Sequence, residues 1–190
     1  MNILVKTYSG HIVSRPDTTW EKDNEDFFPP DFVDRLDFSP VLFARVCKPG
    51  RCVGARFASR YYDSVNYGVL LYPADHIDDG PECFAESLTL DHTSFLPAPL
   101  RTVGELSGID FSLQKNGTEI LSAGKSAAEI TAMVEKSLTE VTSRIYIRTG
   151  DLIAIELSPV SYLATRIEGN FGISGTLDGH PFMSFNVHNI

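Results

Sequence analysis

Two short segments of the chain carry residue types that could do chemistry. The segment Asp75-His76-Ile77-Asp78-Asp79 gathers carboxylate and imidazole groups that could bind a metal ion, although an acidic loop is more often simply solvated. The segment Asp91-His92-Thr93-Ser94 contains the residue types of a hydrolytic triad. Neighbouring residues of an extended segment point to opposite faces, and the sequence has no Gly-x-Ser-x-Gly turn to expose a nucleophile. Neither segment is therefore a favoured catalytic site.

The cysteines argue against a disulfide framework or a zinc site. There are three of them, Cys47, Cys52 and Cys83, and an odd number in a chain of this size does not indicate paired bridges. A structural zinc site needs four ligands at recognisable spacing, which the pair Cys47 and Cys52 alone does not supply. We therefore expect reduced cysteines and a cytoplasmic protein.

Composition narrows the class of protein further. With 190 residues, 43% hydrophobic and 22% charged, the chain can form one domain with a sizeable core. The net charge of −9 repels phosphate backbones, and no Lys/Arg cluster along the sequence offsets it, so we expect no nucleic-acid partner. No apolar run approaches the roughly 20 residues that span a bilayer, and Met1 to Lys6 is too short for a signal peptide. We expect no membrane partner.

The elements that must position any site form an α+β fold dominated by strands. A polar, proline-bearing stretch from Ser14 to Asp34 reads as a connecting arm, with Trp20 and Phe27-Phe28 to pin it down. We therefore divide the chain into an N-terminal strand and extended arm, residues 1–36, and a main domain, residues 37–190. The predicted strands cover residues 2–5, 37–46, 67–72, 109–113, 119–121, 144–147, 152–157 and 182–187.

Local signals identify the turns and helices between these strands. Asn116-Gly117 is typical of a tight hairpin turn. Ser126-Ala-Ala-Glu129 has the spacing of a capping box, and the apolar residues behind it fall on one helical face. A second helix is expected over residues 55–65. Pro40 implies that its strand lies at a sheet edge or carries a bulge.

The order and spacing of four motifs resemble the fumarylacetoacetate hydrolase superfamily. Phe57-Ala-Ser-Arg-Tyr-Tyr-Asp63 is similar to the helix before its metal-site strand. Asn116-Gly117 and Thr149-Gly-Asp-Leu-Ile153 resemble its late hairpin and Gly-Asp turn, and Ile167-Glu-Gly169 looks like its closing hairpin. The resemblance implies a twisted mixed β-roll or barrel with a few helices, usually a homodimer, that cleaves, isomerises or decarboxylates β-dicarbonyl and 2-oxo acids. It also implies Mg²⁺ or Mn²⁺, held by Glu-x-Glu on one strand and Asp on another.

The metal ligands that the resemblance implies are missing. In the register set by Arg45-Val46, Gly50 and the segment from Phe57 to Asp63, the Glu-x-Glu falls on Ser39-Pro40-Val41 and the Asp on Leu70. Hard cations need oxygen ligands, and one hydroxyl with two aliphatic groups replaces three carboxylates. We therefore expect no metal and no cofactor.

Other family features are altered as well. The family's lysine would lie near Leu88, and its Thr-Gly-Thr-Pro falls on Ile155-Glu-Leu-Ser-Pro159. The family's catalytic histidine often follows a Tyr with two residues between, and Tyr8-Ser-Gly-His11 keeps that spacing without the Glu that should come next. Glu156 could point toward the old pocket. The candidates for a vestigial pocket are His11, Ser39, Val41, Leu70 and Glu156.

Three hypotheses about function follow. The first is a non-catalytic relative that pairs with another subunit or binds a small carboxylic or 2-oxo acid. The second is a divergent active hydrolase, isomerase or decarboxylase that uses relocated groups such as Glu156 and His11. The third is a structural dimerisation domain whose pocket is filled by Val41 and Leu70.

Overall fold

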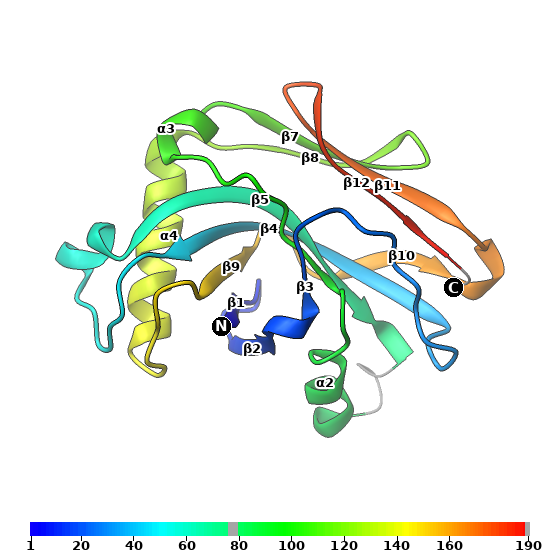
Figure 1. Ribbon diagram of the computed structural model, residues 1–190, viewed down its shortest axis with the longest axis horizontal. Coiled ribbons are helices and arrows are strands. Elements are labelled where there is room, and N and C mark those ends of the chain that lie inside the picture. Colours follow the sequence, from blue (N-terminus) through cyan, green and yellow to red (C-terminus); the bar gives the residue numbers. More distant parts are fainter. Residues whose placement is uncertain (76–79, 189–190) are drawn as a thin grey trace.

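The chain folds into two sheets that pack around a common core, as Figure 1 shows for the computed structural model, which describes residues 1–75 and 80–188. One sheet has eight strands in the order β2-β1-β9-β4-β5-β6-β3, with β10 also paired to β4, and the other has four in the order β12-β11-β7-β8. The strands are β1 (Asn2–Lys6), β2 (Ile12–Pro16), β3 (Trp20–Glu21), β4 (Arg35–Val46), β5 (Tyr62–Pro73), β6 (Ser94–Phe95), β7 (Asp110–Lys115), β8 (Thr118–Gly124), β9 (Leu152–Glu156), β10 (Ser161–Thr165), β11 (Phe171–Leu177) and β12 (His180–Val187).

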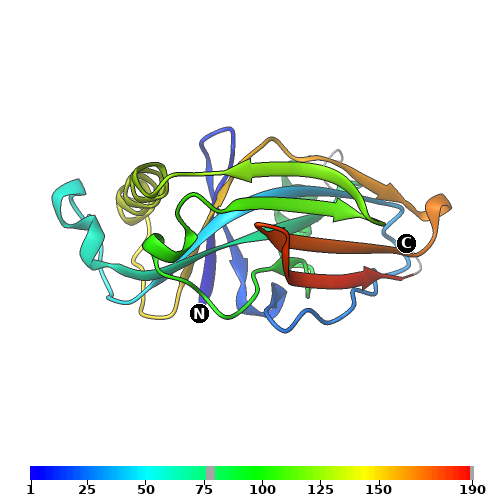
Figure 2. The same ribbon diagram turned by 90° about the horizontal axis from the view of Figure 1, so that it is seen from above.

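Helices cover one end and the rim of this arrangement. Figure 2 shows α4 end-on beside the long strands, with the strands β7, β8, β11 and β12 lying across them. The helices are α2 (Pro81–Ser87), α3 (Val103–Leu106) and α4 (Ala127–Thr142), with 3-10 turns η1 (Asp17–Thr19), η2 (Ala55–Arg60) and η3 (Arg166–Glu168). This strand-dominated mixed roll is the predicted fold class. None of the helices in the described ranges combines the length and apolar character needed to cross a bilayer.

The two faces of the larger sheet support two separate apolar cores. The alternation of side chains along β4 sends Leu42 and Ala44 to the main core, which lies between the two sheets and α4, and sends Val41 and Phe43 to the opposite face. That opposite face is concave, because the sheet curls over β1 and β2 (Figure 1). The concave face is the part of the fold that positions the candidate site.

Two local predictions are confirmed. The hydroxyl of Ser126 accepts the N–H of Glu129 while Glu129 accepts the N–H of Ser126, so α4 begins at the predicted capping box. Its buried side includes Ile130, Val134 and Leu138, as the spacing indicates. The predicted Asn-Gly turn joins β7 to β8, and both of its residues have the positive φ that such a turn requires.

The expectation for Pro40 is wrong, because β4 is a central strand. Its partner on one side changes along its length, from β10 beside residues 35–38 to β9 beside residues 41–45. The carbonyl of Pro40 accepts the N–H of Leu157 on that side. The N and C=O of one strand residue point to the same side, so the missing N–H of Pro40 faces the β9–β10 connection, where no ladder bond is lost.

The predicted helix over residues 55–65 is also wrong in extent. Only Ala55–Arg60 forms a 3-10 turn, and β5 begins at Tyr62. This segment pairs with β4 and does not form a helix, because the side chains from Ser64 to Pro73 are all buried in the sheet. The backbone of Val65 also forms hydrogen bonds with that of Arg101. The expected strand over residues 144–147 is reduced to one bridge between Ile147 and Gly50.

The first 36 residues contribute strands to the larger sheet. Strand β1 lies between β2 and β9, antiparallel to the first and parallel to the second. Beyond β3 the chain continues as an irregular arm over residues 22–34, whose Phe27 is buried in the main core and whose Phe28 is exposed. The aromatic residues therefore do fasten the arm at one point.

Candidate functional site

The structure brings three of the predicted positions together on the concave face. Ser39 and Leu70 are direct partners across the antiparallel strands β4 and β5, and Val41 is two residues further along β4. Residues two apart on a strand share a face, so the three side chains belong to one patch. Glu156 joins them from β9, where it is the partner of Val41.

This patch is filled with apolar side chains. Val41 and Leu70 are both 0% exposed and belong to one cluster with Phe43, Leu96 and Leu88. Leu88 is the residue near which the resemblance places a lysine. The Ser39 hydroxyl is also buried and donates a hydrogen bond of 3.0 Å to the carbonyl of Ser158.

A buried cation lies on the same face. Arg15 is the partner of Ile3 in the β1–β2 hairpin, and Ile3 belongs to the cluster that contains Leu70. The guanidinium of Arg15 is fully buried and donates to the Leu71 carbonyl at 3.0 Å and to the Thr93 hydroxyl at 3.0 Å. It also lies 4.4 Å from the centre of the Tyr72 ring. A positive charge is therefore fixed on the same face as Leu70, where the resemblance places an aspartate.

Glu156 is held in place at the edge of this patch. The Tyr72 hydroxyl donates to one carboxylate oxygen at 2.6 Å, and the backbone N–H of Tyr8 donates to the other at 2.7 Å. Burial raises the pKa of the Tyr72 phenol well above its ordinary value, so the phenol keeps the proton that it donates. Glu156 and Tyr72 line a cavity of about 220 Å³ together with Tyr8, Phe84 and Val160.

The other sequence candidates are not assembled into a site. His11 is exposed in the turn between β1 and β2, and within the described residues only its backbone forms hydrogen bonds. The carboxylate of Asp75 accepts the backbone N–H groups of Asp34 and Arg35, while His76, Asp78 and Asp79 lie outside the described residues.

The segment from Asp91 to Ser94 does not form a triad. The ring of His92 pairs with Glu21 at 3.1 Å, while the Ser94 hydroxyl is buried beside Thr19 and Arg15. A different group of potential metal ligands does come together, formed by Glu21, Glu25 and His92. Their ligand atoms lie within 4.8 Å of one another, and this group was not predicted from the sequence. The cysteines are free, as expected.

Arg15 and Tyr72 are the site residues that sequence reasoning missed. A single arginine in Ile12-Val-Ser-Arg-Pro16 looks like an ordinary solvated charge, and Tyr72 ends an apolar run. Their partners lie more than 50 residues away, and only the pairing of strands across the larger sheet brings them together. No local signal could have found them.

Comparison with known proteins supports the fold and goes no further. No protein-family model matches the chain, and neither does the sequence of any curated protein. Solved structures do match. Fumarylpyruvate hydrolase from Pseudomonas aeruginosa, in complex with Mn²⁺ and pyruvate, has a TM-score of 0.79 and 13% identity, covering 100% of this chain and 90% of that chain.

Two isomerases match as well. 5-Carboxymethyl-2-hydroxymuconate delta-isomerase from Mycobacterium smegmatis has a TM-score of 0.79 and 14% identity, covering 98% of this chain and 78% of that chain. 2-Hydroxyhepta-2,4-diene-1,7-dioate isomerase from Mycobacterium marinum has a TM-score of 0.77 and 17% identity, covering 98% of this chain and 73% of that chain. The chain therefore has the fumarylacetoacetate hydrolase type of fold, as the resemblance implied.

The residues of the concave face do not fit a divalent cation. A cation such as Mn²⁺ needs several oxygen ligands with negative charge, whereas Val41 and Leu70 offer none and the Ser39 hydroxyl already donates elsewhere. The buried guanidinium of Arg15 on the same face would repel a dication. The site as built gives no basis for metal-assisted chemistry at these three positions.

Proposed function

We propose that this protein is a non-catalytic protein with the fumarylacetoacetate hydrolase fold, whose metal site has been replaced by a packed apolar core. The observation that carries the proposal is the burial of Val41 and Leu70 in one cluster with Leu88, at three positions where the resemblance expects charged groups. Because buried side chains of this kind are close-packed, the face has stabilising contacts where an active relative needs ligands.

Charge on the concave face supports the same proposal. The enolate chemistry that the resemblance implies stabilises developing negative charge with a metal ion. Here the cation is Arg15, and its donors already bind the Leu71 carbonyl and the Thr93 hydroxyl. Two of its nitrogens are therefore committed to the protein itself, while Nε has no hydrogen-bond partner among the described residues.

This proposal is tested by titrating the protein with Mn²⁺. Calorimetry measures the affinity, and the broadening of backbone amide signals in NMR spectra locates the paramagnetic ion. We expect no broadening around Ser39, Val41 and Leu70. Micromolar binding of Mn²⁺ at these residues would overturn the proposal. Because Trp20 pairs with Ser94 and Ser94 pairs with Leu70, an ion at Glu21, Glu25 and His92 would also broaden amides near Leu70. Binding confined to that group is recognised by its loss in His92→Gln, and it leaves the proposal intact.

A gain-of-function variant tests the register on which the proposal depends. The triple change Ser39→Glu, Val41→Glu, Leu70→Asp restores the three carboxylates, and the matched control carries Gln, Gln and Asn instead. We expect Mn²⁺ to raise the melting temperature of the acidic variant alone, because a bound ion offsets the repulsion among buried carboxylates. An equal response of both variants would show that these positions are not the old metal site.

A second candidate function is a divergent enzyme, and one observation favours it. Glu156 is a buried carboxylate that lines a cavity of about 220 Å³ and is oriented by Tyr72 and Tyr8, which is how a general base is usually held. This candidate predicts turnover of an acylpyruvate or oxaloacetate. The turnover should be lost in Glu156→Gln, while His11→Gln tests the exposed histidine separately. Absence of turnover of acylpyruvates and of oxaloacetate would reject this candidate.

Two further expectations remain predictions. The homodimer that the resemblance implies is checked by light scattering on the purified protein. The small carboxylic or 2-oxo acid ligand is checked by titrating pyruvate against the Glu156 cavity. Because an anion there must approach the carboxylate of Glu156, we expect binding to strengthen in Glu156→Gln.

A further inference from the structure

We propose that a second cavity, away from the concave face, binds a small amine with a hydrophobic body. This cavity has a volume of about 560 Å³ and lies between residues 25–32 of the arm, the end of α2 and the loop that follows it. We call it the arm pocket. Its size is in the range of about 300–1,000 Å³ that is typical of small-molecule sites.

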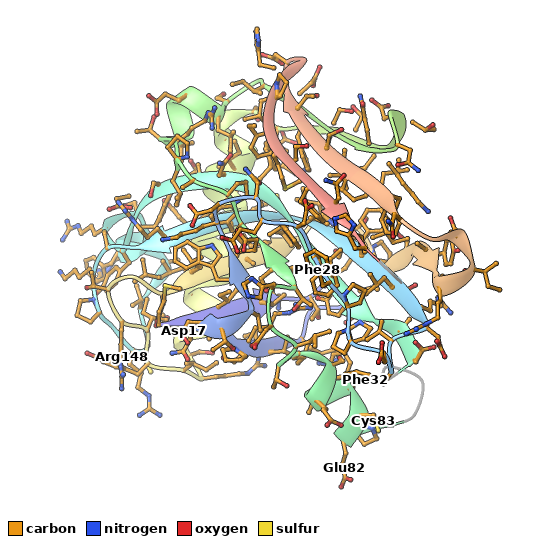
Figure 3. All side chains as sticks on the ribbon, turned by 45° about the vertical axis from the view of Figure 1, so that its right-hand side comes forward. Asp17, Phe28, Phe32, Glu82, Cys83 and Arg148 are labelled. Carbon is orange, nitrogen blue, oxygen red and sulfur yellow. The ribbon has the colours of Figure 1, made fainter. Side chains whose placement is uncertain are left out.

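The walls of the arm pocket are apolar. The arm contributes Phe28, Pro30 and Phe32, and the opposite wall contributes Pro73 and Leu90. Phe28 is 65% exposed and Phe32 is 56% exposed, so two aromatic side chains present much of their surface to solvent around one cavity. Figure 3 shows Phe32 next to the helix that carries Glu82 and Cys83, and Phe28 nearer the middle of the molecule. Such apolar surface is typical of a binding site.

The rim of the arm pocket is acidic. Glu25, Asp26, Glu86 and Asp91 line it, and no Lys or Arg is among its lining residues in the described part of the chain. Within the same described ranges, the carboxylates of Glu86 and Asp91 form no hydrogen bond or ion pair, while that of Glu25 lies within 4.8 Å of the His92 ring and the Glu21 carboxylate. The charges of Glu86 and Asp91 can therefore attract a ligand cation without first losing a partner.

The fourth carboxylate fastens the arm instead. Asp26 accepts the Asn186 backbone N–H at 2.8 Å and pairs with the ring of His188 at 2.7 Å. The ring of Phe28 stacks on that of His188, with centroids 4.7 Å apart, and the backbone of Phe27 bonds to Asn186 and His188. The aromatic wall is thus fixed to the end of β12 before any ligand arrives, which lowers the entropic cost of binding.

Apolar walls and an acidic rim together select the ligand class. A hydrophobic amine buries its body against the aromatic wall and places its ammonium group among the carboxylates, where an aromatic face also attracts a cation. A carboxylate ligand would be repelled by the same rim. A second copy of this chain carries a net charge of −9 and is an unfavourable occupant for the same reason.

The experiment compares three probes with one hydrophobic body: 2-phenylethylammonium, 2-phenylethanol and 3-phenylpropionate. Each is titrated into the full-length, isotope-labelled protein, and backbone amide shifts are followed by NMR. We expect shifts at residues 25–32 and 86–92. The ammonium should bind roughly threefold to tenfold tighter than the alcohol, with the carboxylate weakest, because rim charges are partly screened.

Two variants separate the apolar and the charged contributions. Phe28→Ser with Phe32→Ser should weaken all three probes, because the aromatic wall is lost. Glu86→Gln with Asp91→Asn should reduce the preference for the ammonium over the alcohol and leave the alcohol unchanged. A matched control, Glu82→Gln with Glu135→Gln, removes two exposed or half-buried carboxylates that do not line the pocket and should change neither.

The proposal is overturned by any of three results. The first is tighter binding of the carboxylate than of the ammonium. The second is absence of shifts around the arm pocket with every probe. The third is a dimer in light scattering that dissociates in the Phe28→Ser, Phe32→Ser variant, since a second copy would then occupy the pocket. None of these results depends on Mn²⁺ binding at Ser39, Val41 or Leu70, so the two proposals fail separately.

Discussion

The concave face and the arm pocket use aromatic and apolar side chains in opposite ways. On the concave face Val41, Leu70 and Phe43 are fully buried and pack against one another. At the arm pocket Phe28 and Phe32 stay largely exposed around a cavity of about 560 Å³. Core side chains contribute to folding, whereas exposed aromatic rings around a cavity contribute chiefly when something covers them. The comparison teaches that this chain packs apolar side chains where the resemblance expects a metal site, and leaves aromatic surface exposed around a different cavity.

The largest expected effect comes from charging the filled face. Val41→Asp buries a carboxylate in an apolar cluster next to Glu156, and we expect it to lower the free energy of unfolding at neutral pH by about 4 kcal/mol. The matched control is Ile167→Asp, at an isoleucine that is 96% exposed, where the change should stay within about 0.5 kcal/mol. Urea unfolding of both variants measures the difference. Equal effects would show that the concave face is not packed in solution.

A smaller loss of folding stability is expected when the Tyr72 hydroxyl, which donates to Glu156, is removed. Tyr72→Phe leaves the buried carboxylate with one donor fewer, and a hydrogen bond to a charged group contributes about 1.5–3 kcal/mol. Tyr162→Phe is the control, because its hydroxyl also donates to a carboxylate, that of Glu168, but the ring is 50% exposed. Urea unfolding should show a clear loss for the first and little change for the second. The reverse order would contradict the geometry given for Glu156.

The smallest effect is a pH dependence at the arm pocket. The ion pair with His188 and the Asn186 N–H hold the pKa of Asp26 below its ordinary value. Its stabilising contribution is therefore complete above the ordinary pKa of 3.8 and is lost as the pH falls through the lower folded-state pKa. The stability difference between the wild type and Asp26→Asn should be small and should vanish as the pH falls through this pKa.

Both variants should lose their penalty in acid, but over different pH ranges: that of Asp26→Asn below pH 3.8, and that of Val41→Asp already above it. Burial raises the pKa of a carboxylate introduced at position 41, so the penalty in Val41→Asp should shrink as the pH falls and the group is protonated. Measuring both variants across the same acid range gives the comparison directly. Loss of both penalties over the same pH range would mean that the two regions do not differ in burial as described.

Sequence reasoning predicted the parts of the fold that local chemistry determines. The capping box at Ser126 and the Asn116-Gly117 turn need only a few neighbouring residues, and both are found where the spacing placed them. The helix expected over residues 55–65 failed, because long-range pairing of β5 with β4 decides that segment. The edge position expected for Pro40 was wrong for a similar reason. A proline is tolerated in this central strand because its position faces the gap between β9 and β10, which depends on long-range pairing.

For the candidate site, sequence reasoning was limited by what lies close in space and far in sequence. Ser39, Val41 and Leu70 could be named together because the resemblance fixed their register, and the structure places them on one face. Arg15 could not be connected to Tyr72, nor the arm to α2. The sequence also showed no cluster of basic residues, yet the bridge between Gly50 and Ile147 brings the turn with Lys48 and Arg51 against the loop with Arg144 and Arg148.

The position of β1 within the sheet has a consequence for how the chain folds. Ile3 is paired in parallel with Leu152, and the backbone N–H of Asn2 donates to the carboxylate of Asp151. During synthesis the first strand therefore has only its hairpin partner β2 until β9 has left the ribosome. Contacts of such long sequence separation are slow to form, so the concave face, and with it the burial of Arg15, is expected to close late. Until then the apolar edge of the β1–β2 hairpin is the segment most in need of protection from aggregation.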